Sequence, residues 1–390
     1  MSWIYLDNNA TTKIDELVLE AMLPYLRESY GNPSSVQHWF GREASGAVET
    51  ARERIASTLH VKTNELFFTS GATETINMVL QGIAQRYRRK GQHMITCQTE
   101  HKAVLNTCGI LEKQGIEITY LGVDQNGAID LSELAQSIRE DTIMVCLMAA
   151  NNETGVLHPI KEIAALCQQK DVLYFCDATQ IIGKSDINLD ELPIDILTLS
   201  AHKIHGPKGI GVLYIRRKSK PIQIPPLING GSQEQGRRGG TLNVPAIVGL
   251  GKAFELFDAR PQIKCYRDLL EDKISEHIPQ IIIHAKNAPR LDNTSCIAFP
   301  YLKSSEIMTS LPELALSSGS ACATGLLEPS HVLKAMGVPD NDAYGSIRFS
   351  LSKYTEKQEI HKTVELVTEA VEKIRQQSPI WALYTKGLLD

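Results

Sequence analysis

A lysine stands directly after an apolar segment in the stretch ILTLSAHKIHGPKG, residues 196–209. A charged amine in this position is poorly placed for solvation alone, because the residues before it belong in a core. Burial makes a lysine lose its proton more easily, and the neutral amine can form a Schiff base with an aldehyde. Lys203 is therefore a candidate for covalent chemistry with a carbonyl group.

Two other segments supply groups that complement this lysine. Asp177 closes the apolar run YFC, and TSGATET places a glycine turn before a helix that we expect to begin near Ala72. The free N–H groups of a helix start favour a phosphate, although Thr73 and Thr75 could simply be helix caps and Asp177 could cap a turn. Together the segments offer an amine for an aldehyde, an acid for a pyridinium nitrogen and a phosphate site. The conjunction predicts pyridoxal 5'-phosphate as the cofactor.

A cysteine of a different kind lies in SSGSACATG, residues 317–325, where Cys322 is surrounded by small residues only. Glycine and serine make such a segment flexible and leave a thiol open to partners, whereas a structural cysteine would normally have bulky neighbours. The other cysteines lie mostly in apolar segments and none has C-x-x-C spacing. Buried reduced thiols are thus expected for them, and neither a disulfide framework nor a metal site.

Composition excludes several classes of function. The chain of 390 residues is 43% apolar and 22% charged, with a formal net charge of −5. This balance favours neither nucleic acid nor an anionic membrane as a partner, and no apolar run is long enough to span a bilayer. The N-terminus turns polar within seven residues, unlike a signal or transit peptide. We therefore expect a cytoplasmic protein.

The elements that must position these groups alternate along the chain. Apolar segments at 64–70, 93–100, 117–123, 142–150, 171–178, 195–203 and 209–217 predict strands, and 72–89, 101–115 and 160–170 predict helices between them. Strands without polar alternation, separated by helices, indicate an α/β fold with a mainly parallel sheet covered by helices. From about residue 259 longer helices follow, such as 265–278 and 355–377. We expect a large cofactor-binding domain at 13–258 and a smaller α+β domain of residues 1–12 and 259–390 that carries the cysteine segment.

Nine motifs occur in the order of a known family: YLDNNATT, GNPSSVQH, TSGATETIN, TEHKAVL, NNETG, DATQ, SAHKIHGPKGIG, RRGGTLN and SSGSACATG. The chain resembles, from residue 5 to about 350, the cysteine desulfurases of the nitrogen-fixation and iron–sulfur-assembly type. These belong to the class V aminotransferase superfamily with the pyridoxal-phosphate fold type I. The resemblance implies conversion of L-cysteine to L-alanine, with the sulfur held as a persulfide on Cys322. It also implies delivery of that sulfur to an iron–sulfur scaffold or another acceptor protein.

The resemblance also implies a role for individual residues. Lys203 would bind the cofactor covalently, Asp177 would hold its ring nitrogen, Gln180 its phenolic oxygen, and His101 would stack on the ring and move protons. Arg348 would pair bidentately with the substrate carboxylate, a geometry that lysine cannot reproduce. The further implied contacts are Asn32 and Asn152 to the substrate, Asn152 to the ring, Ala72, Thr73, Ser200 and His202 to the phosphate, and Thr241 to the phosphate of a neighbouring subunit. The last contact implies a homodimer.

The sequence also departs from the family pattern at two positions, and it leaves rival functions open. Gln235 stands where the family usually has a basic residue, and Gly239, close to Thr241, where it often has serine or proline. The rival functions are an aminotransferase, which has no use for Cys322, a selenocysteine lyase, and a non-catalytic sulfur-relay protein, for which Lys203 would be dispensable.

Overall fold

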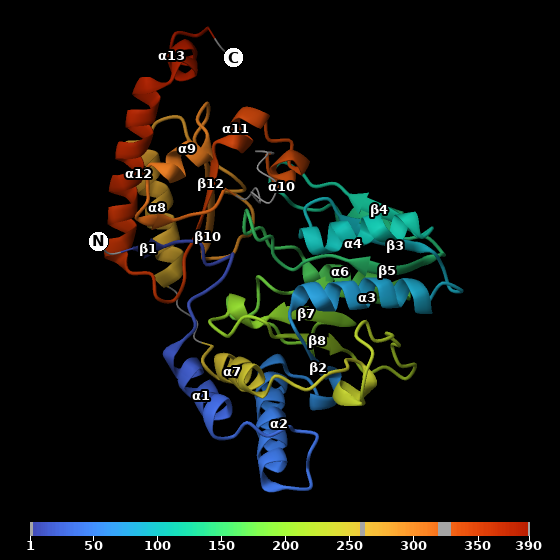
Figure 1. The fold of residues 1–390 in the computed structure, drawn as a ribbon. Helices are drawn as coiled ribbons and strands as arrows, with labels where there is room; N and C mark the ends of the chain where they lie inside the picture. The colour runs from blue at the N-terminus through green and yellow to red at the C-terminus, as the bar shows by residue number, and fades with distance from the viewer. Residues whose placement is uncertain (1–2, 258–261, 319–328, 389–390) are drawn as a thin grey trace.

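A seven-stranded sheet forms the centre of the computed structural model, which describes residues 3–257, 262–318 and 329–388 (Figure 1). The strand order is β2-β8-β7-β6-β5-β3-β4. All neighbours pair in parallel except β8, which runs antiparallel to both β2 and β7. The strands are β2 (Leu66–Thr69), β3 (His93–Cys97), β4 (Glu117–Leu121), β5 (Thr142–Cys146), β6 (Leu173–Asp177), β7 (Ile196–Ser200) and β8 (Gly211–Ile215). The predicted α/β fold with a mainly parallel sheet is confirmed.

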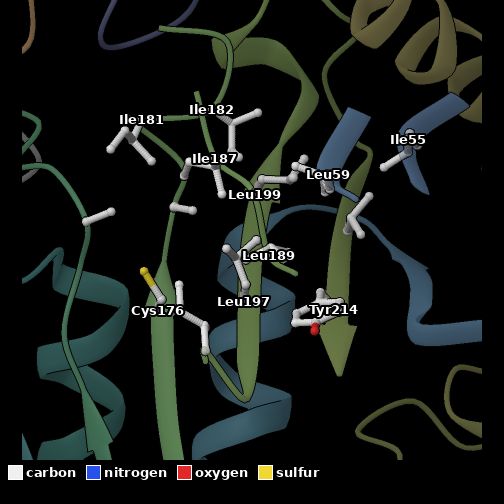
Figure 2. Close-up of a cluster of buried hydrophobic side chains, with 14 of the residues drawn as sticks. Ile55, Leu59, Cys176, Ile181, Ile182, Ile187, Leu189, Leu197, Leu199 and Tyr214 are labelled. Atoms are coloured by element: carbon white, nitrogen blue, oxygen red, sulfur yellow. The ribbon is translucent and has the colours of Figure 1, made fainter. Parts of the chain in front are cut away.

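Helices cover both faces of this sheet, as the unbroken apolar strands predicted. Successive side chains of a strand point to opposite faces, so Phe67 and Phe68 lie in different buried clusters. The cluster around Phe67 contains side chains from helices α3 and α4, and the cluster around Phe68 contains side chains from α2, α6 and α7. Figure 2 shows part of the second cluster, where Leu197, Leu199 and Tyr214 of the sheet lie near Ile55 and Leu59 of α2. The helices of this part of the chain are α1 (Glu16–Arg27), α2 (Trp39–Leu59), α3 (Ala72–Arg86), α4 (Lys102–Lys113), α5 (Leu131–Ser137), α6 (Ile160–Gln169) and α7 (Val244–Glu255).

The rest of the chain builds a smaller layer beside the large sheet (Figure 1). Strand β1 (Ile4–Tyr5) pairs in parallel with β11 (Leu314–Ala315), and the antiparallel sheet β12-β10-β9 consists of β12 (Ser346–Ser350), β10 (Thr294–Ala298) and β9 (Ile282–Ile283). Helices α8 (Gln262–His277) and α12 (Lys357–Gln377) share a buried cluster with these strands. Shorter helices are α9 (Ser304–Thr309), α10 (His331–Ala335), α11 (Asp340–Tyr344) and α13 (Pro379–Thr385). The exact domain division predicted above stays a prediction.

The structure contains helices that the sequence did not indicate. Helix α10 begins at His331, because the Ser330 side chain accepts the N–H groups of Val332 and Leu333. Beside the large sheet, helices α1, α2, α5 and α7 were not singled out from the sequence. In the described ranges, no helix is both long and apolar enough to cross a membrane.

Candidate active site

The parallel strands end at one edge of the sheet, and a cavity of about 360 Å³ opens there. An edge of this kind is where α/β proteins place their ligands. Strand β6 ends at Asp177 and β7 at Ser200, with Lys203 one turn further. Ten of the residues implied by the family resemblance line this cavity: Ala72, Thr73, His101, Asn152, Asp177, Gln180, Ser200, His202, Lys203 and Arg348.

The amine of Lys203 is held by backbone carbonyls at the wall of the cavity. Its Nζ donates hydrogen bonds to the carbonyl oxygens of Asn9 at 2.6 Å and Ala10 at 2.7 Å. Burial, followed by the positive charge of Arg348, lowers the pKa of Lys203 to about 8, although the carboxylates of Asp177 and Asp7 oppose this shift. A larger fraction of this amine is therefore neutral at physiological pH than for an exposed lysine, so it is a better nucleophile.

A helix start beside Lys203 has the features of an anion site. Gly71 precedes α3 with a φ of +146°, a value that glycine adopts without strain. The Ala72 N–H donates to Ser200 Oγ at 2.8 Å, which ties the helix start to the end of β7. Thr75, which could have been a cap, is buried and bonds Thr69 Oγ1 at 2.9 Å instead. The hydroxyl of Thr73, which also lines the cavity, thus belongs to a helix N-terminus that favours a phosphate.

His101 lies at the N-cap of α4, where its ring is oriented by the backbone. Its Nδ1 accepts the N–H of Ala103 at 3.1 Å, so the neutral ring carries its proton on Nε2. Burial lowers the pKa of His101, and the nearby positive charge of Lys203 lowers it further, while Asp177 opposes the shift. The ring is neutral at physiological pH and offers one N–H.

A second histidine, His202, also lines the cavity. Its Nδ1 lies 3.2 Å from Thr11 Oγ1. Burial, followed by the charge of Lys203, lowers the pKa of His202 to about 4. This ring is therefore neutral as well, and it can donate a hydrogen bond to an anion without adding a charge.

Arg348 has one donor without a partner. Its Nη1 donates to the carbonyl oxygen of Asn152 at 2.9 Å and its Nη2 to Asp7 Oδ1 at 2.6 Å. The Nε–H is buried and has no hydrogen-bond partner among the residues that the structure describes. An unpaired buried donor costs about 1–3 kcal/mol, so it needs a compensating function. A guanidinium that lines the cavity with a free donor is suited to binding a carboxylate.

Two implied site residues lie away from this cavity. Asn32 is exposed and its Oδ1 accepts the N–H of Ser34 at 2.9 Å, and Thr241 is exposed. Their chain neighbours Ser34 and Leu242 line a second hollow, of about 280 Å³. Both residues therefore belong to another surface of this chain.

The loop before Thr241 explains one of the departures from the family pattern. A Cβ at Gly239 would lie 2.7 Å from the backbone nitrogen of Gly230, so a serine or proline has no room there. The glycine is thus required by the close approach of two loop segments in this chain.

Cys322 lies outside the described residues, but the other cysteines can be compared. Those that are buried and free are Cys97, Cys108, Cys146, Cys167, Cys176 and Cys296. Burial raises the pKa of each of these thiols, for instance that of Cys97 to about 11, so they are poor nucleophiles. Cys265 is free and exposed. The buried reduced thiols predicted from the sequence are confirmed, with Cys265 as the exception.

Sequence reasoning missed the cavity residues that come from the N-terminus. Asn9 and Ala10 line the cavity, and the Asn9 carbonyl oxygen accepts hydrogen bonds from both Lys203 and Gln180. The missed lining residues are Asn9, Ala10, Ile76, Met148, Ala150 and Thr179. The motif YLDNNATT was the available signal, since a run of polar residues directly after an apolar strand is unusual in a purely structural segment.

Among the residues that the structure describes, no group of three or more His, Cys, Asp or Glu side chains could hold a metal ion.

Comparisons with known proteins cover nearly the whole chain. Residues 4–363 match the protein family described as aminotransferase class-V. The chain is 45% identical over 392 residues to cysteine desulfurase IscS of Pasteurella multocida, and the match covers 99% of this chain and 96% of that protein. Cysteine desulfurase IscS of Haemophilus influenzae is 44% identical, with the same coverage.

Solved structures give the same result. A NifS-like protein has a TM-score of 0.88 at 39% identity, and the match covers 95% of this chain and 100% of that one. A structure described as SspA in complex with cysteine has a TM-score of 0.82 at 37% identity, with coverage of 90% and 100%.

Proposed function

The chain belongs to the class-V aminotransferase family, and from that premise we propose that it is a pyridoxal-phosphate-dependent cysteine desulfurase. It converts L-cysteine to L-alanine and passes the sulfur to its own Cys322. The observation that carries the proposal is the meeting, in one cavity, of the Lys203 amine with the unpaired donor of the buried Arg348. The first group suits an aldehyde cofactor and the second suits an amino-acid carboxylate.

The residues of the cavity fit pyridoxal 5'-phosphate. Lys203 would bind it covalently, and Asp177, which is buried and accepts the Thr179 N–H at 2.9 Å, would hold the ring nitrogen protonated. Gln180 would contact its phenolic oxygen. The phosphate would be held by the start of α3 with Ser200 and His202. When bound, the cofactor supplies an electron sink for the carbon skeleton of the substrate.

Arg348 and Asn152 would orient the substrate. The guanidinium would pair with the carboxylate of L-cysteine, and the Lys203 amine lines the same cavity, within which the substrate's amino group would lie. We assign the movement of protons here to Lys203 and His101, and burial lowers the pKa of both groups. A neutral lysine amine accepts a proton and the ammonium group that forms can return it, while the neutral His101 ring assists with a hydrogen bond from its Nε2–H.

Cys322 would carry out the sulfur transfer. Its thiolate attacks the sulfur of the substrate, and the carbon–sulfur bond breaks with its electron pair remaining on the carbon skeleton. That skeleton takes up protons and leaves as L-alanine, while Cys322 holds the persulfide. The net change is L-cysteine plus a protein thiol to L-alanine plus a protein persulfide, so no external oxidant is needed. A thiol of an acceptor protein, such as an iron–sulfur scaffold, would then take the outer sulfur.

Turnover of L-cysteine tests this function, with alanine and sulfide followed together in the presence of a reducing thiol. The parent should form equal amounts of both, and Cys322→Ala should lose both. Cys265→Ser is the matched control, since it removes the exposed thiol of α8 and should keep full turnover. Turnover that survives in Cys322→Ala would favour the selenocysteine-lyase reaction, which needs no protein thiol. Turnover absent from every variant would contradict the proposal.

The enzyme would work as a homodimer. Tyr30 and Trp39 are 73% and 59% exposed, and the ring of Phe40 lies 5.5 Å and 5.2 Å from theirs, so an aromatic patch faces solvent. Exposed aromatic patches of this kind mark interaction sites. In the sequence, the patch lies next to the loop that contains Asn32. That loop and the loop that contains Thr241 both line the second hollow. This supports a dimer in which Thr241 reaches the phosphate site of the other subunit.

We further propose that residues 13–258 act as the cofactor-binding domain, with residues 1–12 and 259–390 as the smaller domain. The cavity takes Lys203 and Asp177 from the first and Asn9 and Arg348 from the second, so a closed active site requires both.

A further inference from the structure

A second lysine lies behind the cavity, and the mechanism above does not use it. Lys184 lies seven residues after the end of β6 at Asp177, and its Nζ donates hydrogen bonds to Gln180 Oε1 at 2.9 Å and Asn9 Oδ1 at 3.0 Å. A small cavity of about 70 Å³ is lined by both Lys184 and Lys203, and of these two only Lys203 also lines the larger cavity. Burial, followed by repulsion from Lys203 and Arg348, holds the pKa of Lys184 well below its usual range.

The contact with Lys184 determines which way the Gln180 carboxamide points. The Lys184 amine donates to the Gln180 oxygen and the Asn9 carbonyl oxygen can only accept, so the carboxamide turns its oxygen toward Lys184 and its NH₂ group the other way. That NH₂ group donates to the carbonyl oxygen of Asn9 at 3.0 Å. A flipped carboxamide would set its NH₂ group against the amine of Lys184 and its oxygen against the Asn9 carbonyl. Both hydrogen bonds would be lost.

The same amine completes the hydrogen bonding of Asn9. The Oδ1 atom of Asn9 accepts from Lys184 and from Asn293 Nδ2 at 3.1 Å. Its Nδ2 donates to the Asn152 carbonyl oxygen at 3.1 Å and to Thr294 Oγ1 at 2.8 Å. The backbone carbonyl of the same residue holds Lys203 at 2.6 Å. Asn9 thus contacts both lysines. Its backbone carbonyl binds Lys203, and its side chain binds Lys184.

We propose that Lys184 is a positioning residue: it holds Gln180 with its NH₂ group available to the cofactor cavity, and it holds Asn9 where its carbonyl orients the Lys203 amine. The inference rests on the proposed function, because the group that needs the Gln180 donor is the phenolic oxygen of pyridoxal phosphate. Lys184 touches neither the cofactor nor the substrate in this account, since it does not line the larger cavity. Its effect passes through its two hydrogen-bond acceptors.

The test compares Lys184→Met, which keeps the chain length but removes the donors, with Lys353→Met. Lys353 lines the same small cavity, and its amine pairs with Asp15 at 2.5 Å. The readout is the pH dependence of the visible absorption of each enzyme loaded with pyridoxal phosphate. Loss of one hydrogen-bond donor near a negative oxygen disfavours the deprotonated form. The midpoint should therefore rise by about one pH unit in Lys184→Met and stay unchanged in Lys353→Met.

A double-mutant cycle with Gln180→Leu shows whether Lys184 acts through Gln180. If it does, Lys184→Met should add little to the shift that Gln180→Leu already causes. A second readout uses the cofactor-free protein, where the pH dependence of Lys203 acetylation, followed by peptide mass spectrometry, reports the state of that amine. It should change in Lys184→Met. Lys184→Arg, which retains donors, should restore the parent midpoint, and Lys184→Leu, which also lacks a donor, replaces Lys184→Met if the latter does not fold.

The outcomes separate this inference from the proposed function. A parent that binds pyridoxal phosphate and turns over L-cysteine, with a Lys184→Met midpoint equal to that of the parent, overturns the inference alone. Equal shifts in Lys184→Met and Lys353→Met, or additive shifts in the cycle, also overturn it, because they indicate a general loss of packing. A parent that binds no pyridoxal phosphate overturns both.

Discussion

Replacement of Arg348 by lysine changes the group that we assign to the substrate carboxylate. In the structure the guanidinium makes two hydrogen bonds to the protein, to the Asn152 carbonyl oxygen and to Asp7, and its buried Nε–H has no partner within residues 3–257, 262–318 and 329–388. A lysine side chain carries a single nitrogen. It cannot hydrogen-bond both Asn152 and Asp7 while also binding a carboxylate through two parallel hydrogen bonds. Arg348→Lys should therefore lose at least one charge-assisted hydrogen bond to L-cysteine.

The magnitude follows from the cost of that hydrogen bond. A hydrogen bond to a charged group contributes about 1.5–3 kcal/mol, which corresponds to roughly a 10- to 100-fold change in affinity. The carboxylate is bound in the same way before and during the reaction, so the loss should appear in KM, with kcat changed only a few-fold. The assay is steady-state formation of alanine from L-cysteine over a range of substrate concentrations.

Arg290→Lys is the matched control for this prediction. Arg290 pairs with Glu271 through two hydrogen bonds of 2.9 Å and 3.2 Å, both side chains are 4% exposed, and neither lines the larger cavity. The same substitution there should reduce thermal stability and leave KM unchanged. An unchanged KM in Arg348→Lys, or an equal rise in both variants, would refute the assignment of Arg348 to the carboxylate.

Three further predictions concern the acid of the site, a buried carboxyl and the dimer. Asp177→Asn should keep the cofactor attached at Lys203 but lower kcat by about two orders of magnitude, because a charge that stabilises the reacting state is lost. Visible absorption of the cofactor checks its attachment, and turnover of L-cysteine by the same sample checks kcat. Burial raises the pKa of Glu153 from 4.5 to about 7, so between these values the folded chain keeps a proton that the unfolded chain has lost, and stability falls as the pH rises. Glu153→Gln, which keeps an acceptor for Ser330, should remove this loss and gain ~3 kcal/mol over the parent at pH 8 but not at pH 4, as measured by denaturant unfolding; an equal difference at both pH values would contradict it. Trp39→Glu should shift the protein from dimer to monomer in analytical ultracentrifugation, and a variant that stays dimeric would exclude the aromatic patch from the interface.

The groups at the strand ends could be predicted from the sequence because local pattern determines them. Asp177 and Lys203 each follow an apolar run, and the parallel arrangement that such runs favour brings their carboxyl ends to one edge. The N-terminus of α3 was visible for the same reason, since Gly71 marks the turn before it. In each case the signal lay within a few residues of the group itself.

The remaining site residues depend on contacts between distant segments. Asn9 bonds Lys203 across 194 positions of the chain, and Asp7 bonds Arg348 across 341. No periodicity or spacing encodes such pairs. Lys184 could not be distinguished from a solvated surface lysine, because only the fold shows that its amine turns inward to Gln180. Thr241 is exposed in a single chain, so its predicted role requires a second subunit.

The central claim is that Cys322 receives the sulfur of L-cysteine, and peptide mass spectrometry of the enzyme tests it most directly. The loaded enzyme is incubated with L-cysteine in the absence of an acceptor thiol and then digested under conditions that preserve persulfides. The account predicts one added sulfur atom on the peptide of Cys322, none on the peptide of Cys265, and no added sulfur in Lys203→Ala. An unmodified Cys322 while alanine is formed, or sulfur found on another cysteine of the chain, would contradict it.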